Sequence, residues 1–420
     1  MALIGGCIMK KKVLLRAPVL TRSGYGEQSR FAMRSLRSRE DIFDIYIHPL
    51  EWGHTSWVSE NDEERRWIDS RVEAAINYIQ GGGTFDISVQ VTIPNEFENL
   101  ASHNVGYTAG IETTKVAHQW LQKANAMDSL IVVSNHAKNV FENTTYEAVE
   151  QETNRRVELK LNKQVSSVNY PTKVYDNLSA LEMELDYDFN FLTVAQMGPR
   201  KNLENTIRWF IEEFHDDEVG LVVKTNVAKN CQIDREIVHG NLLGILRRPE
   251  YANRKCKVYM LHGDLTDQEM HEIHLHPKIR SLISFTHGEG FGLPIYEAAY
   301  MGTPVVATAW SGQLDFLVDE KGENRFYNVS FDLMPIPEQV EWEGVLVKGS
   351  MWAYPRETSA KIKMRQCYDD VNAGNSDACD YAKELHERFS EEKMYAAFVQ
   401  SINHPITEIE QQEQEILEFE

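Results

Sequence analysis

Residues 287–299 read His-Gly-Glu-Gly-Phe-Gly-Leu-Pro-Ile-Tyr-Glu-Ala-Ala, and this stretch indicates the fold more clearly than any other part of the chain. It follows an apolar run at 282–285, typical of a buried strand, and it enters a helix near Leu293. Pro294 suits the first turn of that helix, where its missing N–H removes no hydrogen bond. Three glycines in the loop allow the backbone to approach a ligand closely: Gly288, Gly290 and Gly292.

Strand-like and helical segments alternate on both sides of this stretch, which predicts α/β domains with parallel sheets and crossover helices. A first series of β-rich runs lies at 13–15, 43–47, 85–91, 104–108 and 130–134. A linker-like run at 170–184 precedes a second series at 189–195, 219–224, 257–262, 281–285 and 304–307. We therefore expect two doubly wound, Rossmann-like domains, at 10–175 and 189–375, and then C-terminal helices with an acidic tail at 376–420. Domains of this kind bind ligands in a cleft at the carboxyl ends of their sheets.

The composition argues against several classes of protein. The 420 residues include 43 Lys plus Arg and 64 Asp plus Glu, a net charge of −21 that opposes extended binding to nucleic acid. The five cysteines show no paired spacing, which favours a reducing compartment over a disulfide framework. No apolar run is long enough to span a membrane, and the first lysines follow the apolar residues, the reverse of a signal peptide. We expect a cytoplasmic protein.

Two carboxylates give the stretch its chemistry. Glu289 lies in the loop and Glu297 one turn into the helix, so both can point into one cleft. Carboxylates bind pairs of sugar hydroxyls strongly, and the free N–H groups at a helix start suit a diphosphate. The alternative is a glycine-rich turn that carries a solvated glutamate.

The string from Glu289 to Glu297 resembles the Glu-x7-Glu signature of the retaining glycosyltransferases of family four, which have the two-domain GT-B fold. The resemblance continues through Met301-Gly-Thr-Pro-Val-Val-Ala-Thr and Trp310-Ser-Gly-Gln-Leu-Asp-Phe. It implies that Glu297 binds the donor ribose and that Glu289, as a catalytic residue, binds the transferred sugar near the reacting carbon. It also implies a donor-binding loop with Gly290, Phe291, Gly292 and Leu293. By analogy with the same fold, we expect helices in 356–398 to return to the first domain.

A second segment, Val194-Ala-Gln-Met-Gly-Pro-Arg-Lys, resembles the family segment that supplies an arginine and a lysine to the diphosphate. Lys201 falls on the lysine position, Gln196 replaces the arginine, and Arg200 is the residue that can compensate. A cation here stabilises the charge that develops on the leaving phosphate; the alternative is a charged helix start. Lys224, at a strand end, is a further donor-binding candidate or a plain strand-end lysine.

Two first-domain segments complete the candidate site. Arg22-Ser-Gly24-Tyr25-Gly26 resembles the family's glycine loop near the donor phosphates. Gly106-Tyr-Thr-Ala-Gly-Ile-Glu112 lies past a strand on the side where many family members carry a catalytic histidine. Glu112 is the candidate here, and it could orient either the acceptor hydroxyl or the donor sugar. The alternative is that it is only a negative charge at the N-terminus of a helix.

We predict no metal and no cofactor, the nucleotide sugar being a co-substrate. Asp186-Tyr-Asp188 matches a metal-binding Asp-x-Asp in form, but it lies in the linker, and we interpret it as solvated. No His/Cys cluster has metal-ligand spacing, and three histidines on or near one helix are interpreted as a polar face: His271, His274 and His276.

The resulting hypothesis is a retaining, metal-independent glycosyltransferase acting from a nucleotide sugar on a glycan or other hydroxyl compound. The first-domain segments also resemble glycosyltransferases of tailed phages, so a hydroxymethylated DNA base is an alternative acceptor. Arginines at helical spacing could then contact phosphates: Arg30, Arg34 and Arg37, flanked by Arg22 and Arg39. A second alternative is a degenerate nucleotide-sugar-binding protein, favoured by Gln196, and a GT-B epimerase or phosphorylase belongs to the same fold.

Overall fold

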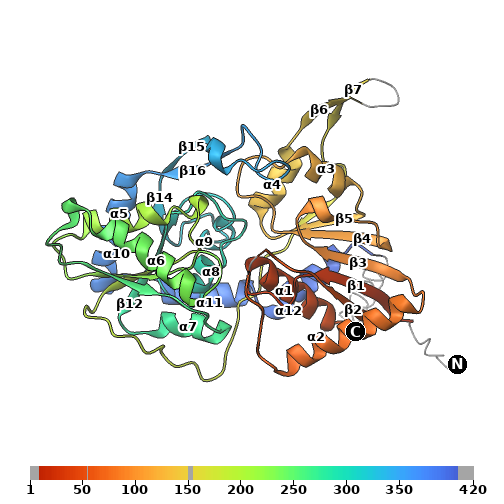
Figure 1. The fold of residues 1–420 in the computed structure, drawn as a ribbon, viewed down its shortest axis with the longest axis horizontal. Coiled ribbons are helices and arrows are strands. Elements are labelled where there is room, and N and C mark those ends of the chain that lie inside the picture. The colour runs from red at the N-terminus through yellow and green to blue at the C-terminus, as the bar shows by residue number, and fades with distance from the viewer. Residues whose placement is uncertain (1–8, 54, 150–154, 405–420) are drawn as a thin grey trace.

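The computed structural model describes residues 9–53, 55–149 and 155–404. The first domain is built on six parallel strands in the order β2-β1-β3-β4-β5-β8 (Figure 1). These strands are β1 (Lys11–Ala17), β2 (Phe43–Pro49), β3 (Phe85–Val91), β4 (Ala101–Thr108), β5 (Ser129–Val132) and β8 (Val165–Ser167). The predicted acidic tail lies outside the described residues.

Helices cover both faces of this sheet because its strands are apolar on both sides. Alternate residues of β5 show the pattern: Ile131 packs with α1 (Gly24–Arg37), whereas Leu130 and Val132 pack with α3 (His118–Asn125) and α4 (Asn135–Asn143). A longer helix, α2 (Glu63–Gln80), lies along β2.

The second domain has another six parallel strands, in the order β11-β10-β9-β12-β13-β14. They are β9 (Asn190–Val194), β10 (Gly220–Lys224), β11 (Lys257–Leu261), β12 (Ile279–Ser284), β13 (Val305–Thr308) and β14 (Tyr327–Val329). One face packs against α5 (Leu203–Glu213), α6 (Gln232–Leu246) and α10 (Glu357–Asn372), and the other against α7 (Asp267–Leu275) and α8 (Leu293–Tyr300). A short helix, α9 (Leu314–Leu317), follows β13.

Two antiparallel hairpins were not predicted. The first, β6 (Tyr146–Val149) and β7 (Arg156–Leu159), projects from the first domain (Figure 1). The second, β15 (Phe331–Pro335) and β16 (Met351–Pro355), follows β14, and the segment between its strands crosses to the first domain. There Asn95 donates to Gly344 O, and Val345 joins the core around Trp120.

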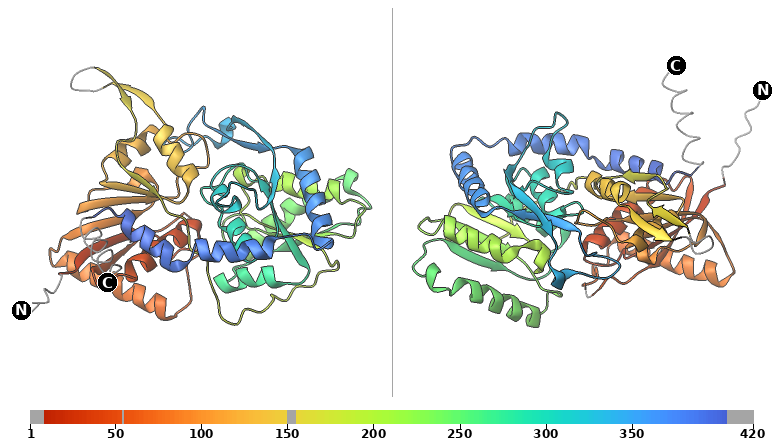
Figure 2. Two further views of the ribbon diagram at one scale, coloured as in Figure 1. Left: turned by 180° about the vertical axis from the view of Figure 1, so that it is seen from behind. Right: turned by 90° about the horizontal axis from the view of Figure 1, so that it is seen from above.

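The chain crosses between the domains again at its C-terminal end (Figure 2). Helix α11 (Ala378–Arg388) packs on α8 of the second domain, and α12 (Glu391–Ser401) packs on α1 of the first. Phe398 of α12 is fully buried against Phe31 and Tyr107. The last described helix therefore belongs to the core of the first domain.

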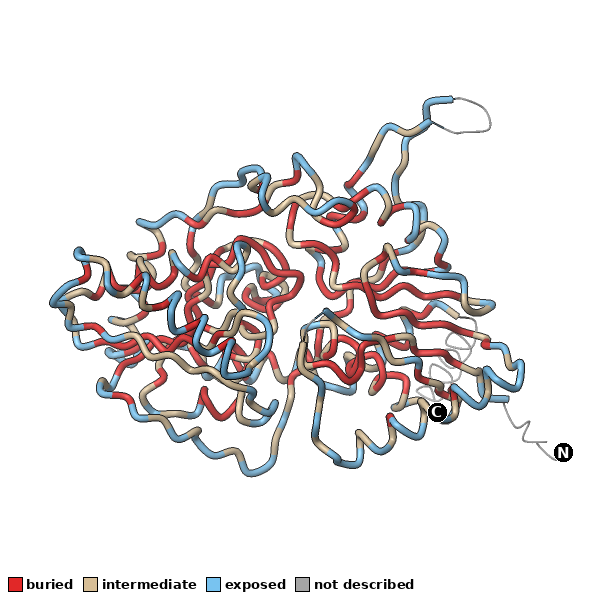
Figure 3. The backbone as a smooth tube through the Cα atoms, in the orientation of Figure 1, coloured by how far each residue is buried: buried red, intermediate tan, exposed pale blue. Residues whose placement is uncertain are grey.

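The two domains share buried surface. One apolar cluster contains first-domain strand residues together with Phe291, Tyr296 and Phe316 of the second domain, and Tyr170 packs on Phe291 with ring centroids 5.0 Å apart. Figure 3 shows buried backbone in both sheets and where the domains face each other. The predicted fold class is confirmed, with two Rossmann-like domains facing across a cleft. The proposed division at 175 and 189 falls between β8 and β9.

Candidate active site

The candidate site is formed at the switch point of the second sheet, where the order in which successive strands are added reverses between β9 and β12. Strands β9 and β12 are neighbours in that sheet although three helices and two strands separate them along the chain, and such switch points are where doubly wound sheets bind ligands. The loop after β9 carries Arg200 and Lys201, and the loop after β12 carries Glu289. Asn202 joins the loops by donating to Phe285 O (2.9 Å). Three predicted site residues are thereby brought together.

Glu289 is held by two cations. Lys201 Nζ donates to Glu289 Oε1 (2.6 Å), and Arg200 Nη1 donates to Oε2 (3.0 Å). Burial raises the pKa of Glu289, but the charges of Lys201 and Arg200 outweigh burial and hold that pKa at about 2. The carboxylate is therefore ionised at every physiological pH.

Glu112 meets this cluster from the first domain. Arg200 Nη2 lies 3.2 Å from Glu112 Oε1, so one guanidinium bridges a carboxylate of each domain. A Cβ on Gly288 would lie 2.5 Å from Glu112 O, and a Cβ on Gly290 would lie 2.7 Å from Ala109 O. These two glycines therefore allow the loop to approach the backbone of the first domain, whereas the sequence predicted that they allow an approach to a ligand. Ser134 reinforces the contact by donating to Gly290 O (2.6 Å).

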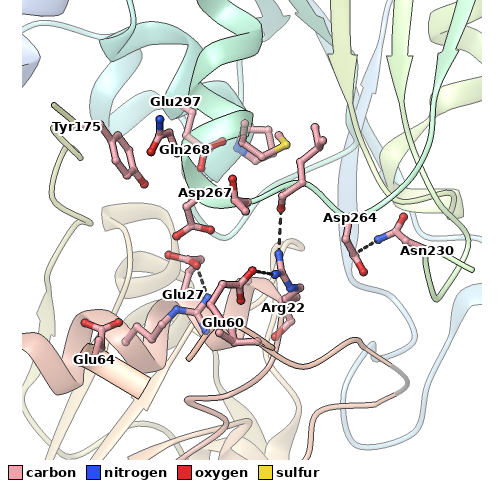
Figure 4. Close-up of a pocket in the computed structure, with 18 of the residues that line it drawn as sticks. Arg22, Glu27, Glu60, Glu64, Tyr175, Asn230, Asp264, Asp267, Gln268 and Glu297 are labelled. Carbon is pink, nitrogen blue, oxygen red and sulfur yellow. Dashed lines mark hydrogen bonds and ion pairs between the residues drawn. The ribbon is translucent and has the colours of Figure 1, made fainter. Parts of the chain in front are cut away.

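Glu297 faces a separate part of the cleft. It lies on α8 and lines a cavity of about 560 Å³ between the domains, together with Gly24, Lys224 and Pro294 (Figure 4). Burial raises the pKa of Glu297 to about 8, against the opposing charge of Lys173. The pKa shifts of the two glutamates of the motif therefore have opposite signs, although only seven residues separate them in the sequence.

The start of α8 offers free donors next to both glutamates. Gly292 has a φ of +99°, a left-handed conformation that favours glycine, and it turns the chain into the helix. Among the described residues no group accepts a hydrogen bond from the backbone N–H of Phe291, Gly292 or Leu293. The Phe291 ring itself is buried in the shared core.

The predicted glycine loop of the first domain divides into two parts. Gly24 lines the cavity, and no described atom lies within 4 Å of a Cβ placed on it. Tyr25 turns inward, with its hydroxyl 2.9 Å from Thr108 Oγ1 and its ring stacked on Trp52. Gly26 is required by packing, since its Cβ would lie 1.9 Å from Thr21 O.

Lys224, Gln196 and Arg200, which were considered as ligands of the donor, differ in their hydrogen-bond partners. Lys224 lines the cavity and donates to Gly263 O (2.7 Å). Gln196, which the sequence resemblance aligns with an arginine, donates to Val227 O (2.7 Å), and among the described residues it has no hydrogen bond to Glu289. Arg200, by contrast, contacts the central carboxylate directly.

Sequence reasoning missed Lys173, which lies in the linker after β8. Its ammonium group donates to Glu27 and to Asp267, each at 2.8 Å, and it lies close enough to Glu297 to affect its ionisation. No spacing rule signals this group because its partners come from three separate elements.

The Asp-x-Asp residues pair with lysines on the exterior, Asp186 with Lys257 (2.8 Å) and Asp188 with Lys278 (3.6 Å). Among the described residues no group of three His, Cys, Asp or Glu side chains is arranged to hold a metal ion. His271 and His274 are buried on α7, where they contact Tyr300 and Thr303. The metal-independent mechanism stays a prediction.

The arginines considered for DNA contact are all paired with carboxylates. The pairs are Arg22–Glu60, Arg30–Glu27, Arg34–Glu64, Arg37–Glu63 and Arg39–Asp41. Pairing compensates the charge that would attract phosphates. The DNA acceptor therefore rests on the sequence resemblance alone. Among the residues that the structure describes, no helix has the length and apolar character needed to cross a bilayer.

Comparison with solved structures identifies the fold. The chain is similar to sucrose-phosphate synthase from Thermosynechococcus elongatus, with a TM-score of 0.58 and 12% identity over 93% of this chain and 98% of that one. It is similar to a glycosyltransferase from Rickettsia africae (TM-score 0.56, 12% identity, 94% and 98% covered). It is also similar to HepE of Anabaena, solved with UDP-glucose (TM-score 0.56, 14% identity, 93% and 99% covered). No protein-family model and no curated protein sequence matches it. The fold is GT-B.

Proposed function

We propose that this GT-B protein transfers a sugar from a nucleotide-sugar donor to an acceptor hydroxyl, with retention and without a metal. The observation that carries the proposal is the pair of glutamates flanking the start of α8. Glu289 is ionised between Lys201 and Arg200, and Glu297 lines the interdomain cavity. Free N–H groups lie between them in the sequence. In the proposal the sugar binds at Glu289, the diphosphate at these N–H groups and the ribose at Glu297.

In this proposal the donor diphosphate binds at the N-terminus of α8 and forms ion pairs with Lys201 and Arg200. The ribose hydroxyls donate to Glu297, and the transferred sugar lies against Glu289. Gly24 of the first domain and Lys224 of the second both line the cavity, so a donor bound there contacts both domains. These roles follow the family resemblance and the positions of the side chains.

The reaction breaks the bond between the anomeric carbon and the phosphate oxygen, and the electron pair leaves with the diphosphate. The acceptor oxygen bonds to the same face of the anomeric carbon, and its proton passes to the departing phosphate oxygen. Lys201 and Arg200 stabilise the negative charge that develops there. The transition state has oxocarbenium character, so the fixed negative charge of Glu289 beside the sugar also stabilises it. In this proposal Glu112, which pairs with Arg200, orients the acceptor hydroxyl or the donor sugar.

A degenerate binding protein is the second candidate, and Gln196 is the observation that favours it. The family arginine is missing, and Gln196 makes a backbone hydrogen bond away from the ion cluster. In this alternative the chain binds nucleotide sugars but does not transfer them.

The test is binding and hydrolysis of a panel of nucleotide sugars by the wild type and by Glu297→Ala. We expect one donor to bind selectively, with binding lost in the variant, and an acceptor screen should then give an α-linked product from an α-linked donor. Binding without turnover against both glycans and hydroxymethylated DNA would favour the degenerate protein. A wild type that binds no nucleotide sugar would refute the proposed function.

A further inference from the structure

The linker between the two domains contributes a side chain to the cleft. Lys173 lies between β8, the last strand of the first sheet, and β9, the first strand of the second. Its side chain is only 20% exposed, which is low for a lysine. Tyr175, two residues further on, lines the same cavity as Glu297 (Figure 4). The linker between the two sheets thus also forms part of the wall of the proposed donor site.

Lys173 joins the two domains by ion pairs. Its Nζ lies 2.8 Å from Glu27 Oε2, on α1 of the first domain, and 2.8 Å from Asp267 Oδ2, at the start of α7 in the second. Arg30 pairs with the other oxygen of Glu27 and so holds this carboxylate in place. Burial would raise the pKa of Glu27, but Arg30 and Lys173 together lower it. The result is a chain of four charged groups that crosses from one domain to the other.

Glu297 lies beside this chain of charges. Lys173, Glu27 and Glu297 line one small cavity with Leu293 and Tyr296. Without the ammonium group, the carboxylates of Glu27 on α1 and Asp267 on α7 would face each other across the domain boundary, with Arg30 left to offset them. Like charges so close together oppose closure, so the charge of Lys173 favours contact between α1 and α7 beside Glu297.

We propose that Lys173 is a positioning residue that ties the two domains together beside Glu297 and thereby sets the affinity for the donor. The role in donor affinity rests on the proposed function; the role in joining the domains does not. A donor that contacts both walls of the cavity binds the closed arrangement, so any loss of closure before binding raises the apparent dissociation constant.

The chain offers a matched control. Lys361 also bridges two carboxylates, Glu212 and Glu357, at 2.6 Å each, and its side chain is 23% exposed. Both partners lie in the second domain, on α5 and α10. Lys173→Met and Lys361→Met therefore remove the same charge from similar surroundings, but only the first removes a link between domains. Lys173→Arg restores the charge and tests for rescue.

We expect Lys173→Met to raise the KM for the donor about tenfold, a coupling of ordinary size, with a smaller change in kcat. Small-angle X-ray scattering without donor should give a larger radius of gyration for Lys173→Met than for the wild type. Lys361→Met and Lys173→Arg should resemble the wild type in both measurements.

Equal donor KM and equal radius of gyration for Lys173→Met and Lys361→Met would overturn the proposal. Equal radii with a raised KM would also overturn it, because Lys173 would then act on the donor without joining the domains. If the wild type binds no nucleotide sugar, the proposed function fails, while the scattering comparison still decides whether Lys173 holds the domains together.

Discussion

At the scale of single residues, the two glutamates of the motif show how surroundings divide roles between identical side chains. Glu289 has two cations within 3.0 Å and a pKa of about 2. Glu297 forms no ion pair with any residue that the structure describes, and its pKa is about 8. Opposed shifts of this kind separate a permanent charge from a group that titrates near neutrality. The permanent charge lies beside the proposed reacting sugar, and the titrating group lies beside the proposed ribose.

Replacing Glu289 by Gln should lower kcat by about 100-fold or more, as loss of a preorganised charge at a reacting centre does. The amide keeps the shape of the side chain but leaves Lys201 and Arg200 without their shared anion. The measurement is kcat with the selected donor, with donor affinity by calorimetry beside it. Glu320→Gln, at an exposed position, is the control. A kcat equal to that of the control would remove Glu289 from the proposed centre.

Glu297→Gln should increase stability at alkaline pH while abolishing donor binding. The pKa of Glu297 in the folded protein, about 8, lies above its ordinary value of 4.5, so the folded state binds the proton more tightly. The free energy of unfolding therefore falls as pH rises from about 4.5 to 8, and the loss is complete above pH 8. The variant lacks this loss, and its Tm should exceed the wild type's by about 2 °C or more at pH 9. At pH 4 the two should agree; the same difference at both pH values would contradict the raised pKa.

At the scale of elements, local patterns in the sequence predicted the strands, turns and helix starts, because these depend on residues that are neighbours in the chain. The turn at Gly292 and the helix from Leu293 lie where glycine and Pro294 predicted them, and the strand expected at 282–285 is observed as β12 at Ile279–Ser284. Contacts between distant elements were not predictable in this way. Gly288 and Gly290 allow close contact with the backbone of Glu112 and Ala109. A glycine in the sequence predicts such a close contact, but it does not predict which segment makes it.

Lys173 illustrates the same limit, since its partners are 146 and 94 residues away along the chain. The β15–β16 hairpin does so too, because the segment it carries finds its apolar neighbours only in the other domain. Hydrophobic periodicity predicts which face of an element is buried, but it does not predict which other element packs against that face. The glutamates and Lys201 could be predicted as site residues from the sequence because the resemblance supplied this missing information.

The two glycines at the start of α1 separate packing from ligand contact within one element. Gly26→Ala should lower the Tm by about 4 °C or more, because its Cβ would meet the backbone oxygen of Thr21 at 1.9 Å and overpacking of this kind costs up to about 3 kcal/mol. Arg30 also donates to that oxygen, which limits its movement. Gly24→Ala should leave the Tm within about 1 °C, since its Cβ enters open space. Differential scanning calorimetry of both variants checks this, and equal losses would contradict the close approach at Gly26.

At the scale of the whole molecule, the chain crosses between the domains more than once, and each crossing opposes their separation. The linker carries Lys173, the segment within the β15–β16 hairpin inserts Val345, and α12 completes the core of the first domain. A cleft bounded in this way can open only by strain in several connections. We expect the two domains to move as a hinge of limited range, with the donor site at its inner edge.

The last crossing makes the first domain depend on a helix near the other end of the chain. Phe398→Ala should lower the Tm by about 6 °C or more, because a fully buried phenylalanine in contact with Phe31 and Tyr107 is worth about 3–5 kcal/mol. Gln400→Ala, exposed on the same helix, should change the Tm by no more than about 1 °C. If α12 were only an appendage, both variants would melt like the wild type by calorimetry. If it belongs to the core, Phe398→Ala should also weaken donor binding at temperatures near its Tm, because Gly24 and Glu27 lie on the α1 helix that α12 supports.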